Sequence, residues 1–88
     1  MSDELVQRVL KVVATSKRIP LERVTVDSAF QDLGIDSMDA VEILFGLENE
    51  FDISIPDEEV RAVRDVRGMC EGVERLVAAK ASAPEAGQ

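Results

Sequence analysis

The 88-residue sequence contains no histidine, tryptophan or tyrosine, and its one cysteine is Cys70. The absence of histidine removes the side chain that most often serves as a general base and as a metal ligand. A lone cysteine excludes an internal disulfide and a zinc site built from cysteines. No basic group or helix start beside Cys70 would activate its thiol, so we expect a small buried residue there.

Lysine and arginine are absent from residues 24–60, a segment that holds 11 of the 18 acidic residues. This block carries a charge of −11 within a chain of net charge −8. Nucleic acid is therefore not an expected ligand, because binding to phosphates requires clustered lysine and arginine. A protein partner with a basic surface is the natural complement of such a segment.

Long apolar runs are also missing, and the longest, residues 43–47, is far too short to cross a bilayer. The first residues, Met1–Glu4, lack the basic and apolar regions of a signal peptide. We expect a monomeric protein of the cytoplasm that has no contact with membranes.

Apolar residues recur at helical spacing in several parts of the chain. The spacing predicts one helix over residues 3–17 and a second over residues 37–51. A short third helix is expected to begin after Pro56 and to end near Val63 or the residue after it. Asp65 is in place to cap a fourth helix.

The fold class that follows is all-α. We expect a four-helix bundle with three longer helices, a short third helix and a long ordered loop over residues 18–35. Seven apolar side chains in that loop would anchor it to the core. Residues 1–80 form the expected domain, and residues 81–88 are expected to be a disordered tail.

The second helix carries two apolar stripes on a helical wheel. The stripe expected to face the core consists of Ala40, Ile43, Leu44, Leu47 and Phe51. Met38, Val41 and Phe45 lie on nearly the opposite side and are framed by acidic residues that include Glu42 and Glu48. An exposed apolar patch with a charged rim is more often an interaction site than an accident, and the alternative is that a neighbouring loop covers it.

One serine, Ser37, is expected at the first turn of this helix. Gly34 permits the turn before it, Asp36 can cap the helix, and Asp39 occupies the position of the acid in a capping box. A phosphate on the Ser37 hydroxyl would gain about 0.3–1 kcal/mol from the helix dipole. The simpler interpretation is an ordinary serine at a helix start, since such serines are common.

Catalysis and metal binding find little support around Ser37. No histidine or lysine lies near it in the sequence to act as a base, and no Gly-x-Ser-x-Gly motif surrounds it. Asp32, Asp36 and Asp39 do not have the spacing of a calcium-binding EF-hand loop. We therefore expect neither an enzyme nor a dedicated metal site.

Three segments of the chain together resemble the acyl carrier proteins. Asp32–Asp39 is similar to the modification motif of that family, and Val41–Phe51 and Ile55–Glu59 are similar to its second and third helices. The resemblance implies that a separate phosphopantetheinyl transferase moves 4′-phosphopantetheine from coenzyme A onto Ser37. The covalent arm then carries acyl groups as thioesters to enzymes of fatty acid, lipid or polyketide biosynthesis.

The same resemblance implies roles for further residues. Asp36 and Asp39 would flank the attached cofactor. The partner-binding face would consist of Met38, Val41, Glu42, Phe45 and Glu48, which meet basic docking patches on acyl-processing enzymes. The acyl chain would tuck between helices, lined by Leu47, Ile55, Val60, Val63 and Met69.

Arg61, Arg64 and Arg67 depart from the family pattern, because carriers of primary fatty acid synthesis are often acidic at these positions. The pathway therefore stays open. The main alternative function is a small acidic adaptor that binds a basic partner without modification. A peptidyl carrier is disfavoured by Asp36, and a serine hydrolase by the missing histidine.

Overall fold

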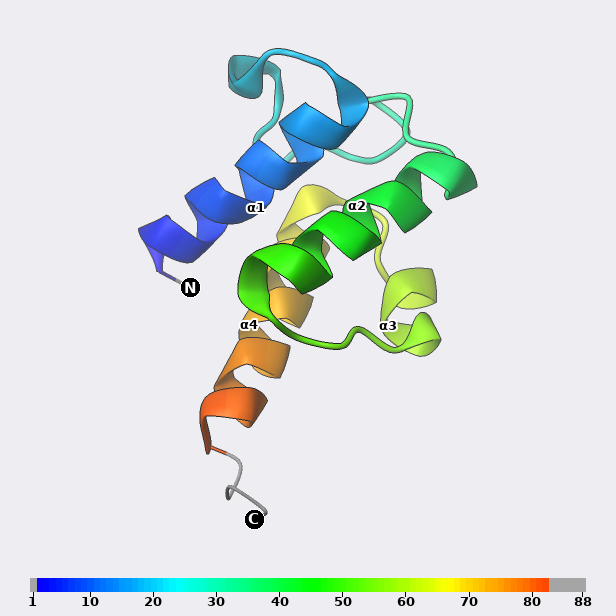
Figure 1. The fold of residues 1–88 in the computed structure, drawn as a ribbon. Coiled ribbons are helices and arrows are strands. Elements are labelled where there is room, and N and C mark those ends of the chain that lie inside the picture. The colour runs from blue at the N-terminus through cyan, green and yellow to red at the C-terminus, as the bar shows by residue number, and fades with distance from the viewer. Residues whose placement is uncertain (1, 83–88) are drawn as a thin grey trace.

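A computed structural model describes residues 2–82 of the chain (Figure 1). Over this range it contains four α-helices and one short 3-10 helix, and no strand. The elements are α1 (Asp3–Lys17), η1 (Leu21–Arg23), α2 (Ser37–Phe51), α3 (Asp57–Ala62) and α4 (Val66–Ser82). The predicted all-α fold is confirmed. Helix α4 continues two residues into the segment expected to be a tail, and residues 83–88 lie outside the described range.

Local capping explains where the first helix begins and ends. The Ser2 side chain accepts a hydrogen bond from the backbone N–H of Leu5, which satisfies one of the free donors at the start of α1. At the other end Arg18 adopts a left-handed conformation with φ of 60°, and its N–H bonds to the carbonyls of Ala14 and Thr15. The chain then leaves the helix into the loop that leads to α2.

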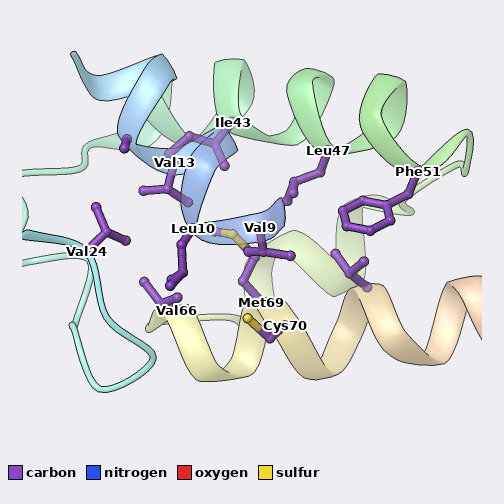
Figure 2. Close-up of a cluster of buried hydrophobic side chains, with 12 residues drawn as sticks. Val9, Leu10, Val13, Val24, Ile43, Leu47, Phe51, Val66, Met69 and Cys70 are labelled. Atoms are coloured by element: carbon purple, nitrogen blue, oxygen red, sulfur yellow. The ribbon is translucent and has the colours of Figure 1, made fainter. Parts of the chain in front are cut away.

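The hydrophobic core lies where α1, α2 and α4 face one another (Figure 2). In Figure 2 the α2 residues Ile43, Leu47 and Phe51 point toward α4, which contributes Met69 and Cys70 among others. The predicted core stripe of α2 is confirmed, since these three α2 residues are buried and the other two members are partly buried. Burying one side chain of this size stabilises the folded state by about 1.5–3 kcal/mol.

Helices α1 and α2 approach each other closely at Gly46. A Cβ atom added there would lie 2.9 Å from the Cγ1 atom of Val12 on α1. Real Cβ atoms do not come so near a methyl group, so glycine is what allows α2 to pack at this distance.

The loop over residues 18–35 is ordered, as predicted. Val24 is buried in the core, and Phe30, Leu33 and Ile35 pack against it. Figure 1 shows this loop running over the end of the helices where α2 begins. It therefore determines how the first turn of α2 is presented.

The loop also pairs with the link between α3 and α4. The N–H of Phe30 donates to the carbonyl of Arg64, and the N–H of Val66 donates to the carbonyl of Ser28, each at 3.0 Å. An isolated antiparallel bridge between Ala29 and Asp65 results. Helix α3 accordingly ends at Ala62, slightly before the predicted end, because the following backbone is extended toward this bridge.

In residues 2–82, no helix combines the length and apolar character needed to span a membrane.

Candidate functional site

Ser37 is the first residue of α2, and its side chain is exposed. Asp36 is the N-cap. The N–H of Asp39 donates to Oδ1 of Asp36 at 2.8 Å, and the N–H of Asp36 donates to Oδ2 of Asp39 at 3.2 Å. The predicted capping box is therefore present, and it holds the first turn of α2 from both sides of Ser37.

The turn before the site depends on Gly34. Its φ is +70°, in the left-handed region that residues with a side chain rarely adopt. A Cβ atom added to Gly34 would meet nothing within 4 Å, so the requirement for glycine comes from the backbone and not from crowding. The N–H groups of Gly34 and Ile35 donate to the carbonyls of Gln31 and Phe30, at 3.1 and 3.0 Å, which closes the turn.

Lys17, at the end of α1, supports the capping box from outside. Its Nζ donates to Oδ2 of Asp39 at 2.9 Å. The hydrogen bond from Lys17 is the largest cause that lowers the pKa of Asp39, and the hydrogen bond that Asp39 accepts from the Asp36 backbone lowers it further. Asp39 therefore stays ionised and serves the local structure as well as the surface charge. Sequence reasoning missed Lys17, because no local pattern links residues 22 positions apart.

Three polar groups at the start of α2 remain available. Within residues 2–82, the Ser37 hydroxyl and the backbone N–H groups of Ser37 and Met38 form no hydrogen bond. Free N–H groups at the positive end of a 15-residue helix favour an anion placed there. A phosphodiester on the Ser37 oxygen fits this arrangement, since its negative charge would lie at the helix start and the rest of the group in solvent.

The second apolar stripe of α2 is exposed. Met38, Val41 and Phe45 have 76%, 44% and 57% of their surface exposed. No loop covers these residues in the described part of the chain, which settles the alternative raised by the sequence. Glu42, beside them, is also exposed, and its side chain makes no hydrogen bond or ion pair with residues 2–82.

Glu48, predicted for the same face, has a structural contact instead. Its Oε2 accepts a hydrogen bond from the backbone N–H of Ile55 at 2.8 Å, and the residue is half-buried. This contact ties the end of α2 to the segment that leads into α3. Glu42 is therefore the more accessible acidic residue of the two.

The five residues predicted to shelter an acyl chain all line one cavity of about 50 Å³. It lies among α2, α3, α4 and the loops beside them. The complete lining is Phe30, Ala40, Ile43, Leu44, Leu47, Ile55, Glu59, Val60, Val63, Met69, Gly72, Val73 and Leu76. Glu59 is the charged member of this set, and sequence reasoning assigned it only to the start of a helix.

Cys70 plays no part in this arrangement, and the acidic residues do not form a metal site. Cys70 is buried, and burial raises the pKa of its thiol, which keeps it protonated and unreactive. Among residues 2–82, no three histidine, cysteine, aspartate or glutamate residues are grouped so that they could hold a metal ion.

Comparison with known proteins shows which family the chain resembles. Residues 4–73 match the family described as the phosphopantetheine attachment site. An acyl carrier protein of Rickettsia bellii (strain RML369-C) is 42% identical over 65 residues, covering 73% of this chain and 76% of that protein. A chloroplastic acyl carrier protein of Brassica napus is 41% identical over 80 residues, covering 88% of this chain. This chain spans 58% of the length of that plant protein.

A solved structure named "Mupirocin didomain ACP" has the same fold. It superimposes with a TM-score of 0.69 over 98% of this chain and 45% of that one, at 17% sequence identity. At such low identity the similarity concerns the fold alone.

Proposed function

The chain belongs to the acyl carrier proteins, a family defined by a phosphopantetheine attachment site, and we propose that Ser37 is the residue to which the arm is attached. The observation that carries the proposal is the exposed Ser37 hydroxyl at the capped start of α2. The family consists of carriers and not of catalysts, so a separate transferase performs the attachment.

The residues around Ser37 hold and present the reacting oxygen. When bound, 4′-phosphopantetheine supplies a terminal thiol that forms thioesters with acyl groups. The capping box of Asp36 and Asp39 keeps the serine at the first helical position, and Lys17 holds Asp39 in place. The free N–H groups of Ser37 and Met38 would face the phosphodiester, and the helix dipole would stabilise its charge.

We propose that partner enzymes dock on the exposed face formed by Met38, Val41, Glu42 and Phe45. Apolar contact with the stripe would supply binding energy, and basic residues on the partner would pair with Glu42 and the acidic segment around it. The partners are a phosphopantetheinyl transferase and acyl-processing enzymes of fatty acid, lipid or polyketide biosynthesis. The carrier acts as a monomer in the cytoplasm.

The cavity between α2, α3 and α4 is proposed as the shelter for the acyl chain. Its walls at Leu47, Ile55, Val60, Val63 and Met69 are apolar, and apolar surface favours an alkyl chain over water. A chain placed there would leave the aqueous phase and approach the core from the side of α3.

The attachment is tested with purified protein, coenzyme A and a broad-specificity phosphopantetheinyl transferase, followed by measurement of the intact mass. We expect the wild type to gain the mass of one phosphopantetheine group and Ser37→Ala to gain nothing. Ser54→Ala is the matched control, because Ser54 is also exposed within the acidic segment but does not begin a helix. A folded wild type that stays unmodified would favour the unmodified adaptor instead.

A further inference from the structure

We propose that the ion pair between Glu59 and Arg75 limits the length of the acyl chain that the cavity accepts, by holding α3 against α4. The proposal rests on the proposed function of the cavity as an acyl shelter. Nη2 of Arg75 donates to Oε1 of Glu59 at 2.6 Å, so the pair joins the short helix to the long one.

Glu59 is an exception in the lining of the cavity, where the other residues are apolar side chains and a glycine. The side chains of Glu59 and Arg75 are 29% and 61% exposed, which places the pair at the rim of the cavity and not in its depth. An ion pair at the rim closes the gap between two helices without placing an uncompensated charge against the apolar walls.

Gly72 is the residue of α4 that lies beside the ion pair. The residue is buried in the interior of the helix, where glycine is less favourable than alanine. A Cβ atom added there would lie 3.4 Å from Oε1 of Glu59 and 3.7 Å from Nη2 of Arg75. The carboxylate therefore lies beside the backbone of α4 at Gly72, where an added Cβ atom would be in ordinary van der Waals contact with it.

Helix α3 depends on this contact more than the longer helices would. It has six residues, none of them fully buried, and its first turn has no side-chain cap. Val60 and Val63 are half-buried on the side that faces the cavity. Because little apolar burial holds α3 in place, loss of the ion pair to α4 should measurably change the position of α3.

The volume of the cavity determines the acyl chain length above which α3 has to move away from α4. At about 10–15 Å³ for each water-sized group, 50 Å³ admits roughly three to five such groups. A butanoyl chain, with four carbons, matches this volume, whereas a dodecanoyl chain, with twelve, exceeds it and would need α3 to move away from α4 to be sheltered along its length. Exposed ion pairs typically change an equilibrium by a factor of about 1.5 to 5, so loss of the pair should favour the wider state by that factor.

The experiment loads butanoyl- or dodecanoyl-phosphopantetheine from the corresponding acyl-coenzyme A with a broad-specificity transferase. Cleavage of the thioester by hydroxylamine is then timed by intact mass, because a sheltered chain draws the thioester toward the protein and slows the cleavage. Glu59→Gln and Arg75→Gln break the pair, and Arg75→Lys retains its charge. Arg67→Gln is the matched control, since it breaks a 2.6 Å ion pair from α4 to Asp27 that does not line the cavity.

We expect the wild type to protect the butanoyl thioester more than the dodecanoyl thioester. Glu59→Gln and Arg75→Gln should slow cleavage of the dodecanoyl thioester by about 1.5- to 5-fold, whereas Arg75→Lys and Arg67→Gln should resemble the wild type. Equal dodecanoyl cleavage in wild type and Glu59→Gln would overturn the inference, as would an Arg67→Gln effect of the same size. Failure of loading itself would instead count against Ser37 as the attachment site, which separates the two proposals.

Discussion

Two phenylalanines on α2 are expected to respond in opposite ways to truncation. Phe51 is 8% exposed, and the guanidinium of Arg8 lies 4.4 Å from the centre of its ring. Replacing such a residue with alanine leaves a cavity and costs about 3–5 kcal/mol. Phe45 is 57% exposed, so less than half of its surface is buried. Since a fully buried phenylalanine contributes about 1.5–3 kcal/mol, Phe45→Ala should lower the free energy of unfolding by only about 1 kcal/mol.

Binding should show the reverse order. We expect Phe45→Ala to raise the KM of the transferase for the carrier about 5- to 30-fold, equivalent to about 1–2 kcal/mol for an aromatic contact residue. Phe51→Ala should leave that KM within about twofold, at a temperature where the variant remains folded, because Phe51 faces the core.

Urea unfolding followed by circular dichroism measures the stability of both variants, since the chain has no tryptophan or tyrosine to report by fluorescence. Transferase kinetics over a range of carrier concentrations measures binding. The assignment of the exposed stripe to docking would be refuted if Phe45→Ala left KM unchanged. It would also be refuted if Phe45→Ala destabilised the fold as much as Phe51→Ala.

Three further variants test how the fold presents the site. Gly46→Ala should destabilise the protein by up to about 2 kcal/mol in urea unfolding. Overpacking against Val12 at 2.9 Å costs about 1–3 kcal/mol, and the higher helix propensity of alanine offsets about 1 kcal/mol of that cost. A gain in stability, or no recovery when Val12→Ala is added, would contradict this. Gly34→Ala should lower the free energy of unfolding by about 1–2 kcal/mol because of the positive φ at this position, and Gly34→Asn should lower it less because asparagine adopts this conformation more readily. Equal losses for the two variants would argue against backbone strain. Asp39→Asn should be less stable than wild type at pH 7. Because Lys17 lowers the pKa of folded Asp39, this difference should begin to shrink as the pH falls below the unfolded value of about 3.9 and should be lost once the pH has fallen through the lower folded pKa. A difference that persists unchanged in acid would disprove the linkage.

Local signals made much of the fold predictable. The predicted bounds of residues 3–17 and 37–51 are those of α1 and α2. Both helices have continuous apolar periodicity, and α2 begins at a capping box whose two members lie three residues apart. Such information is contained within one helical turn, so it can be read without knowledge of the tertiary structure.

Contacts between distant residues could not be predicted in the same way. A carboxylate on a helix surface can face a partner protein or another part of its own chain, and its sequence position does not distinguish the two. Glu48 bonds to the N–H of Ile55, and Asp39 is held by Lys17, because the chain returns to these points in three dimensions. Glu59 has the local pattern of a helix-start acid, yet it lines the cavity because α4 passes beneath it at Gly72.

The central claim is that the helix start at Ser37, and no other hydroxyl of the acidic segment, accepts the phosphopantetheine arm. The lack of lysine and arginine in residues 24–60 allows a direct measurement, because trypsin cuts after Arg23 and Arg61 and releases a single peptide. That peptide contains four hydroxyl side chains, those of Thr25, Ser28, Ser37 and Ser54. Fragmentation of the modified peptide in a mass spectrometer should locate the group on Ser37. Attachment at Thr25, Ser28 or Ser54, or an unmodified peptide from folded protein, would contradict the account.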